Sequence, residues 1–526
     1  ADNFRLAPAR ASAFVDDGCK PVFRVRTALG REICTTLTHP FLTGDGWQPL
    51  ERPAVGERVA VPRRLPVFGR ERLPEHQVKV LAYMIADGGT TQTNALFTNA
   101  DPRLRAEFAE AVAAFPGLVG RPVESAGRTP ALRVSREPQA LVTAREAFGR
   151  ALRGALARAG MTGEVLAGAL NVSKAAVSGW CQGRAMPAEA TFGRLCHVLE
   201  VPPAELEVDD YARAAKNASS PMRRFLEAHG VWGMKATAKR IPAGIFRLEK
   251  PLLALFLNRL FACDGSAFVQ ASGQARVSYA SSSRELIREV QHLLLRFGIL
   301  AKVREKPHAK ASPDCLPWEL EILDRASIET FVAEIGIFGK ESRLAEVQAW
   351  LGGKRHHSNR DSLPRSVNRY VKAIKGERSW RHLFEGGNLH LSGGSERCLS
   401  RARAAELAAV LEDEYLANLA DSDLYWDEIV EITPLGHQQV YDLTVEGTHN
   451  FVAEDVCVHN TTFAMNLVEH AVIASDRPVM VFSMEMPAES LMLRMLSALG
   501  RIDQTRVRTG QLEDEDWPRL TSAVNL

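Results

Sequence analysis

Three consecutive residues near position 460 have side chains that could cleave a peptide bond without water. The side-chain amide nitrogen of Asn460 can attack its own backbone carbonyl, forming a succinimide and releasing the segment that follows. His459 can donate a proton to the leaving group, and the Thr461 hydroxyl could accept an acyl group from upstream. A His-Asn-Thr triplet is common by chance and on its own indicates a turn, so the surrounding sequence must decide.

The sequence around this triplet resembles the two C-terminal splicing blocks of inteins, over residues 440–452 and 456–460. Residues 30–43 resemble the Thr-x-x-His block near an intein's start. The resemblance implies an all-β splicing domain, the Hint fold shared with hedgehog autoprocessing domains. Short apolar stretches separated by Gly and Pro, from Pro21 to about Pro62 and again in 428–445, agree with β-strands at both ends.

The intein resemblance also assigns roles to four residues. Thr36 and His39 would polarise the upstream scissile peptide, and Asp442 and His449 would assist acyl transfer and Asn cyclisation. Inteins begin with a Cys or Ser nucleophile inside a recognisable first block, and no such block precedes Thr36. We therefore expect the downstream half of the splicing chemistry in this sequence and not all of it.

Two apolar helices in the middle of the chain each end in Asp-Gly, in residues 81–89 and 257–266. Ordinary helix C-terminal glycines are the simpler interpretation, but the repeated carboxylate weakens it. The pair resembles the LAGLIDADG homing endonucleases, which often interrupt inteins. That resemblance implies that Asp87 and Asp264 lie together at the bottom of a saddle that binds double-stranded DNA.

Two carboxylates brought close together would suit Mg²⁺, which keeps several waters and binds phosphate oxygens. Such a metal can activate water and stabilise the leaving oxygen. Lys239 matches a family block that supplies a basic residue near the metal, and Lys340 is its expected second-half counterpart. A solvated surface charge is the alternative for each lysine.

Residues 151–207 resemble a helix-turn-helix of the Cro/repressor type, with Ala167, Val172, Val177 and Trp180 in its core pattern. The resemblance implies a recognition helix that presents its polar side chains to the major groove. A purely structural helical bundle is the alternative. The expected DNA-binding residues are Ser173, Lys174, Ser178 and Gln182.

Residues after Asn460 resemble the RecA-like motor of DnaB-type replicative helicases, with an amphipathic helix start, a buried strand and Glu485. By that resemblance Thr461, with Thr462, belongs to a phosphate-binding loop that holds Mg²⁺ and ATP, and Glu485 orients the attacking water. The loop's Lys is absent, so we expect an incomplete nucleotide site. The flanking helicase segments would be the splicing partners, and the complete helicase would be a homo-hexamer.

The amino-acid composition narrows the possible classes of protein. A net charge of +2 over 526 residues does not by itself indicate a nucleic-acid binder. The eight cysteines include no CxxC pair, which argues against a zinc ribbon and a disulfide framework and favours reduced thiols in a cytoplasm. No apolar run reaches the length of a membrane helix. Both ends of the sequence are interpreted as cut ends of a longer precursor.

The expected fold is multidomain: an all-β Hint domain interrupted by an α+β LAGLIDADG endonuclease that carries an all-α helix-turn-helix insert, then a partial α/β RecA-like domain. Two alternatives remain, a sequence-specific DNA-binding regulator and a hedgehog-like autoprocessing protein without an endonuclease. The expected domains are the splicing domain in 1–75 and 425–460, the endonuclease halves in 76–150 and 208–352, the helix-turn-helix in 151–207, a linker or extension in 353–424, and the helicase start in 461–526.

Overall fold

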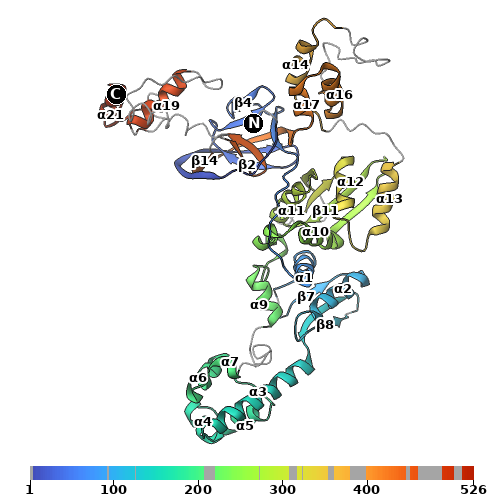
Figure 1. Cartoon of the computed structure of the whole chain (residues 1–526), viewed down its shortest axis with the longest axis vertical. Coiled ribbons are helices and arrows are strands. Elements are labelled where there is room, and N and C mark those ends of the chain that lie inside the picture. The colour runs from blue at the N-terminus through green and yellow to red at the C-terminus, as the bar shows by residue number, and fades with distance from the viewer. Residues whose placement is uncertain are drawn as a thin grey trace. The chain divides into compact units, whose positions relative to one another are not determined.

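The computed structural model describes residues 4–91, 94–124, 126–206, 220–271, 273–306, 317–322, 324–352, 361–378, 398–445, 450–459, 488–500, 502, 507 and 512–525. The chain divides into two compact units (Figure 1). One unit combines both ends of the sequence, Ala1–Leu65 and His356–Leu526, and the other is the middle, Pro66–Arg355.

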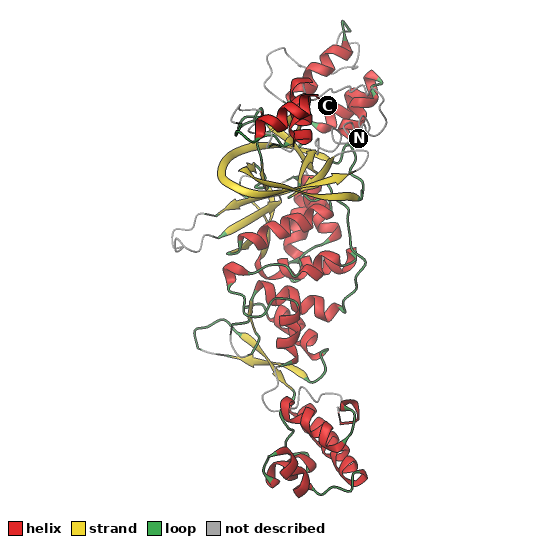
Figure 2. Ribbon diagram, turned by 90° about the vertical axis from the view of Figure 1, so that its left-hand side faces the viewer, coloured by secondary structure: helices red, strands yellow, loops and turns green. Residues whose placement is uncertain are grey.

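The first unit is built on one eight-stranded sheet, whose strands are drawn in yellow in Figure 2. These strands come from both ends of the chain, as the colours of Figure 1 show. Its longest strands, β1 and β14, pair antiparallel along most of their length with several register shifts. Short strands such as β5 and β16 are apolar runs with nearly every residue buried, as expected for strands covered on both faces. The sheet-rich ends predicted from the sequence are confirmed. The strands, in sheet order, are β15 (Asn450–Ala453), β16 (Val456–His459), β3 (Pro40–Thr43), β5 (Arg58–Pro62), β14 (Leu424–Val445), β1 (Ala11–Thr27) and β2 (Glu32–Thr35), with β4 (Gly46–Pro49) paired to β3.

Three helices among the described residues precede the return to this sheet: α14 (Arg365–Lys375), α16 (Arg401–Leu411) and α17 (Glu414–Ala420). They share a hydrophobic cluster with Trp47, Trp426 and Cys457 of the strands. The sequence suggested a linker or extension over 353–424, and the described residues of that range include these three helices. The helical spacing of apolar residues in α14 was not recognised in the sequence, because the helix is rich in basic residues and only Val367 and Val371 are buried.

The second unit contains two halves with the same order of elements, helix, two strands, helix, two strands. The first helices of the two halves, α1 (Glu75–Ala86) and α10 (Lys250–Asp264), pack on each other within one continuous core. The first half adds β6 (Gly88–Gly89), β7 (Leu96–Thr98), α2 (Pro102–Ala113), β8 (Leu118–Val123) and β9 (Ala131–Arg136). The second adds β10 (Gly265–Val269), β11 (Ala275–Ser281), α11 (Arg284–Arg296), β12 (Ala301–Glu305) and β13 (Trp318–Ile322).

Each half closes with further helices. The first has α9 (Pro221–Ala228) and the short 3-10 turns Ala236–Ala238 and Ala243–Arg247. The second has α12 (Arg325–Glu334) and α13 (Glu341–Gly352). The sheets have equivalent orders, β6-β7-β9-β8 and β10-β11-β13-β12, so the weak repeat in the sequence corresponds to a structural duplication.

Between β9 and α9 the described residues form five helices with a separate hydrophobic cluster. Ala167, Val177 and Trp180 are buried in that cluster, and Val172 packs against it, as the sequence pattern predicted. Ser173 caps α5 by accepting a hydrogen bond from Ala176 N at 3.2 Å. The helices are α3 (Pro138–Arg158), α4 (Gly163–Leu170), α5 (Lys174–Cys181), α6 (Glu189–Leu199) and α7 (Pro203–Leu206).

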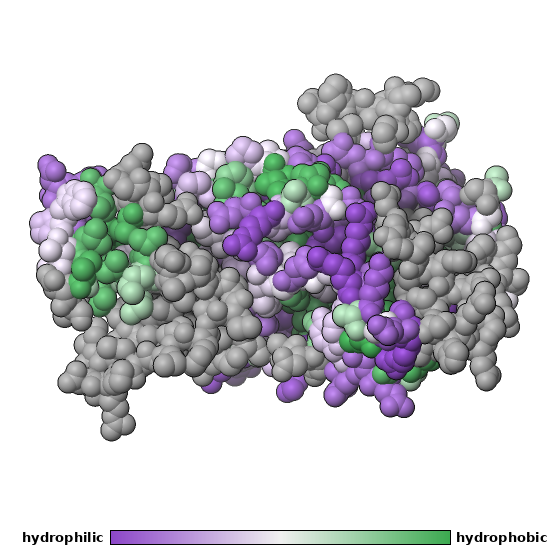
Figure 3. All heavy atoms as spheres, turned by 90° about the horizontal axis from the view of Figure 1, so that it is seen from above, coloured by the Kyte–Doolittle hydropathy of each residue, from purple (hydrophilic) through white to green (hydrophobic). Residues whose placement is uncertain are grey.

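Near the C-terminus the structure describes α19 (Ala488–Gly500) and α21 (Asp516–Asn525), which pack on each other. Among the described residues, no helix combines the length and apolarity required to span a bilayer. Hydrophilic side chains separate small hydrophobic groups over the coloured surface in Figure 3. All the described cysteines are free thiols, in agreement with the sequence argument against a disulfide framework.

Candidate functional site

The structure describes most of the predicted site residues. Five of them, His449, Asn460, Thr461, Thr462 and Glu485, lie outside the described residues. The others fall into three places: the eight-stranded sheet, the ends of α1 and α10, and the α4–α5 turn.

Strand pairing brings the two predicted splicing blocks together. The last strand before the junction, β16, pairs antiparallel with β3, with Val458 opposite Phe41. This register places His459 beside Pro40, the residue after His39. The upstream Thr-x-x-His block and the downstream His-Asn block, more than 400 residues apart, therefore meet at adjacent strands.

The Thr-x-x-His block forms a tight turn before β3. The backbone N–H of His39 donates to the Thr36 carbonyl at 3.2 Å, and the hydroxyls of Thr36 and Thr38 lie 3.2 Å apart. Burial lowers the pKa of His39 to about 4, although the Asp17 carboxylate opposes that shift. At neutral pH the His39 imidazole is therefore neutral and can both donate and accept a hydrogen bond.

Asp442 lies on β14 opposite Val15 of β1. Burial raises the pKa of its carboxyl, a hydrogen bond from its neighbour Leu443 opposes this, and the charge of Asp17 raises the pKa further. Asp17, in the bulge of β1 between Asp16 and Cys19, thus acts on both Asp442 and His39. The sequence did not single out Asp17, because only the β1–β14 register brings it to these residues.

Asp87 and Asp264 occupy equivalent positions at the C-terminal ends of α1 and α10. The glycine after each is fixed by close packing, because a Cβ at Gly88 would lie 2.3 Å from the Met84 carbonyl and one at Gly265 2.5 Å from that of Phe261. Partial burial and repulsion by Asp87 raise the pKa of Asp264 to about 6, although its side chain still reaches solvent. The structure therefore brings the two predicted carboxylates into one site.

The two predicted lysines make equivalent contacts. Lys239 donates to the carbonyl of Ala86 at 2.6 Å, and Lys340 donates to the carbonyls of Cys263 at 3.3 Å and Gly265 at 2.6 Å. Each ammonium thus binds at the carbonyl end of the helix that carries one aspartate. Burial lowers the pKa of both lysines, and the two aspartates oppose the shift. These contacts argue against a free surface charge at either position.

Two neighbours of the carboxylates were missed in the sequence. Asn99 donates from its side chain to Asp87 Oδ2 at 2.6 Å. Tyr279 of β11 is fully buried, and burial together with the nearby Asp264 charge raises the pKa of its hydroxyl. Asn99 falls in an ordinary loop, whereas Tyr279 faces the core at the position opposite Gly265, so only strand register could have indicated it.

A buried ion pair between Glu107 and Arg259, called the clasp below, joins the helices that carry the aspartates. Arg259 of α10 donates two hydrogen bonds to Glu107 of α2, at 2.8 and 2.6 Å. Tyr83 and Lys79 of α1 also bind that carboxylate. Burial alone would raise the pKa of Glu107, but these donors outweigh it and lower the pKa to about 2. The clasp fixes α1 against α10 and thereby the separation of the two carboxylates.

The carboxylate pair fits a cation that keeps most of its waters. No group of three or more His, Cys, Asp or Glu side chains within the described ranges could enclose a metal. Mg²⁺ does not need such a cage, because it is often held by one or two carboxylates with water and substrate phosphate. The crowding of negative charge at Asp264 is what a divalent cation would relieve.

The predicted DNA-binding residues lie at the start and along one face of α5, where Ser173, Lys174, Ser178 and Gln182 are exposed. Gln182 donates to the Ser178 hydroxyl at 3.3 Å. Lys174 forms an ion pair with Glu164 of α4. A phosphate would therefore have to compete with Glu164 for the Lys174 ammonium.

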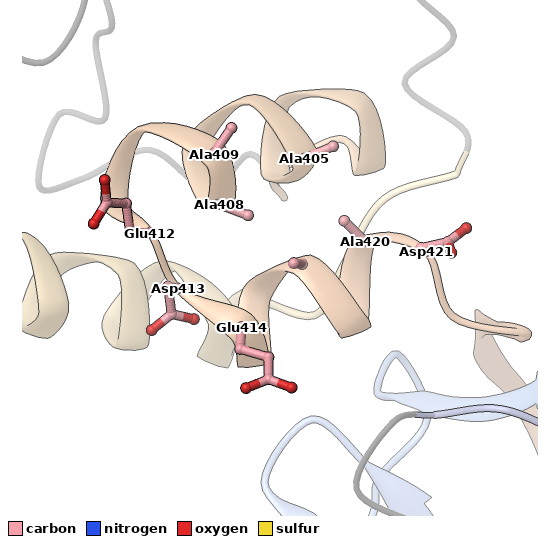
Figure 4. A pocket seen from close by; sticks show the side chains of 9 residues that line it. Ala405, Ala408, Ala409, Glu412, Asp413, Glu414, Ala420 and Asp421 are labelled. Atoms are coloured by element: carbon pink, nitrogen blue, oxygen red, sulfur yellow. The ribbon is translucent and has the colours of Figure 1, made fainter.

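A shallow depression between α16 and α17 contains none of the predicted site residues. Its floor is formed by alanines, and the side chains of Glu412, Asp413 and Glu414 project at the turn between the helices (Figure 4). Asp413 caps α17 and accepts the Tyr370 hydroxyl at 2.9 Å. That carboxylate is already used in holding the helices, so we assign the depression no function.

Three family models match parts of the chain. A LAGLIDADG-like domain matches residues 251–336, a helix-turn-helix domain matches residues 147–208, and a DnaB-like helicase C terminal domain matches residues 445–526. The first match covers the second half of the duplicated unit, and the second covers α4 to α7 with part of α3.

Curated relatives match most of the chain. Replicative DNA helicases DnaB from Rhodothermus marinus and from Synechocystis sp. are 30% and 28% identical to it, each over 87% of the chain. The chain spans less than half of these proteins, 42% and 45% of their lengths. A crystal structure of a variant of the Ssp DnaB mini-intein is 37% identical over 13% of this chain and 42% of that one, with a TM-score of 0.12.

The low pKa of His39 predicts a loss of stability in acid. Unfolded His39 would bind a proton below pH 6.5, whereas the folded protein would not do so until about pH 4. The free energy of unfolding should therefore fall across this window, by up to about 3 kcal/mol from this group. Denaturant unfolding followed at pH 7 and pH 4.5 measures it. His39→Gln should lose less stability over the same interval, and an equal loss would contradict the assignment.

Proposed function

We propose, from its similarity to DnaB-type replicative helicases over most of its length, that the chain is an intein-containing relative of that family and that its first unit is a Hint domain that carries out protein splicing. The observation that carries this proposal is the β3–β16 pairing, which brings His39 and His459 to neighbouring strands. Residues 1–75 and 425–460 would be the two parts of this splicing domain. In a precursor that also carries the upstream nucleophile, excision would join the segments on either side of the domain, whereas this chain is expected to carry out only the downstream cleavage.

In the proposed splicing reaction the steps are divided among residues of the two splicing blocks and Thr461. The Asn460 side-chain amide attacks its backbone carbonyl, the bond to Thr461 breaks, and His459 protonates the departing amine. Thr461 supplies the hydroxyl that receives the upstream acyl group. Thr36 and the neutral His39 hold the upstream scissile peptide by hydrogen bonds, and Asp442 and His449 assist acyl transfer and cyclisation.

We propose that the duplicated unit is a homing endonuclease whose substrate is double-stranded DNA, with halves in 76–150 and 208–352. Its proposed cofactor is Mg²⁺, held by Asp87 and Asp264, which when bound would activate water and stabilise a leaving oxygen. Asn99 orients Asp87, and the clasp around Glu107 holds the helices in register. Lys239 and Lys340, close to both carboxylates, would bind the DNA phosphate.

The helices in 151–207 are proposed to be an inserted DNA-binding module. Ser173, Lys174, Ser178 and Gln182 form an exposed polar face on α5, which is the helix that enters the major groove in a helix-turn-helix. The module would lengthen the DNA site that the endonuclease contacts and thereby increase its specificity.

The segment after the junction is proposed to begin the ATPase motor of the host helicase, with the segment in 353–424 as an extension of the splicing domain. Thr461 and Thr462 would bind the phosphates and Mg²⁺ of ATP, and Glu485 would orient the attacking water. The complete helicase would be a cytoplasmic homo-hexamer that unwinds DNA. The DNA-binding regulator and the hedgehog-like protein are less suitable alternatives, because neither accounts for the helicase relatives.

The splicing proposal predicts release of residues 461–526 from the chain. Asn460→Ala should abolish release, and His459→Gln should slow it roughly a hundredfold because the leaving amine loses its acid. Mass spectrometry of the purified protein over time measures both fragments. Asp87→Asn, in the other unit, is the control and should leave the rate unchanged. Release that persists in Asn460→Ala would refute the junction assignment.

The metal proposal predicts an acid limit for Mg²⁺ binding. Asp264 must be ionised to bind a cation, and its pKa is raised to about 6, so affinity should fall about tenfold per pH unit below that value. Titration calorimetry of the chain at pH 5 and 7.5 measures it. Asp264→Asn should bind weakly at both pH values. Equal affinity of the unaltered chain at both would count against the site.

The Lys174–Glu164 ion pair predicts a gain of DNA affinity when it is broken. Glu164→Gln should tighten binding to non-specific double-stranded DNA about two- to fivefold, since it frees the ammonium for phosphate. Lys174→Ala should weaken binding and lower the salt slope by about one. Fluorescence anisotropy measures both. Glu329→Gln, which breaks the exposed Arg325–Glu329 pair, is the matched control for net charge, and an equal gain there would overturn the prediction.

A further inference from the structure

The imidazole of His459 lies against an aromatic side chain from a different strand. The ring centroids of Trp47 and His459 are 4.9 Å apart, with the planes tilted by 56°. Trp47 belongs to β4, which pairs with β3, and β3 in turn pairs with β16. From this geometry we propose that Trp47 is a positioning residue for the cleavage step, which fixes the His459 ring and stabilises its protonated form.

The physical basis is the charge distribution of the indole ring. An aromatic face attracts a cation within about 6 Å of its centroid, most strongly for Trp. In the proposed splicing reaction, His459 must carry a proton that it gives to the leaving amine. A neighbouring indole would favour that protonated imidazole and limit the rotation of the ring.

Trp47 is itself held by the helices that precede β14. It packs against the cluster formed by α14, α16 and α17 with the sheet. Ser366 of α14 donates its hydroxyl to the Gly44 carbonyl at 2.8 Å, and Arg369 binds Asp45 at 2.8 Å. A Cβ at Gly44 would lie 2.4 Å from the Ser366 hydroxyl oxygen, so the β3–β4 turn fits closely against α14. These helices thereby support the ring that contacts His459.

Charged and titratable groups also lie on the elements packed against β16. They are His39 before β3, the Asp45–Arg369 ion pair at the β3–β4 turn, Glu454 and Asp455 in the turn between β15 and β16, and Arg31, which donates to the Asp455 carbonyl at 3.1 Å. Each is unchanged in the variants below. A change in the titration of His459 in those variants therefore reports the indole.

The role of Trp47 in cleavage rests on the proposed splicing function. The first test concerns the Trp47–His459 contact itself and does not require cleavage. In the full chain carrying Asn460→Ala, NMR titration would measure the pKa of His459. Trp47→Leu should lower it by about half a unit, corresponding to the loss of a cation–π contact, and Trp47→Phe should lower it by less. Trp426→Leu removes another indole of the same cluster, 4% exposed, and should leave that pKa unchanged.

An unchanged pKa in Trp47→Leu, or an equal shift in Trp426→Leu, would overturn the inference. If Trp47→Leu does not fold, Trp47→Phe decides, because its smaller ring should still give a measurable decrease and no decrease would overturn the inference.

A second test uses the chain with Asn460 intact and measures release of 461–526 against pH. Trp47→Leu should move the rate profile towards acid by the same half unit, which is about threefold in rate on its alkaline side. A profile that does not move would contradict a role in cleavage. Release that is insensitive to Asn460→Ala would instead refute the splicing proposal. The NMR titration of His459 would still test whether Trp47 stabilises the protonated imidazole.

Discussion

The pairing of β5 with β14 is the constraint on which the rest of the chain depends. Pro62 lies opposite Leu424, and the Arg63 N–H donates to the Asp423 carbonyl at 2.6 Å. The chain therefore leaves the eight-stranded sheet and returns to it at directly paired residues. Because the entropy of closing a loop rises only slowly with its length, a very long insertion is tolerated once these two residues are paired.

Arg401 strengthens this point of return. Its buried guanidinium donates to the carbonyls of Leu419, Ala420 and Leu424, at 2.9, 3.0 and 2.6 Å, and pairs with Asp361 at 3.0 Å. One side chain thus ties α16 and α17 to the first residue of β14. A buried charge is stable only when its donors are satisfied, so these helices and the strand form one structure. Helix α14, which shares a hydrophobic cluster with α16 and α17, carries the contacts to the β3–β4 turn. These helices thereby join the point of insertion to the residues beside His459.

Two carboxylates lie close together in the candidate metal site, and two lysines reduce the repulsion between them. Asp87 and Asp264 stand at helix C-termini, where the helix dipole and unpaired carbonyls are already negative. Lys239 and Lys340 bind those carbonyls and reduce the repulsion between the two carboxylates. Both residues were predicted from the sequence, as were Thr36, His39 and His459, because each lies in a short local motif. Asn99, Asp17, Trp47 and Glu107 were not, since their partners are fixed only by strand register and helix packing.

The duplication explains where the helices α3 to α7 are inserted. In the second half, β13 ends at Ile322 and α12 begins at Arg325. In the first half the equivalent connection runs from β9, ending at Arg136, to α9, beginning at Pro221. The five described helices there bury their own apolar residues in a cluster distinct from the core of the duplicated unit. A connection that is short in one half can therefore hold a small folded module in the other. The module forms its own hydrophobic core and is joined to the unit only at the two ends of the connection.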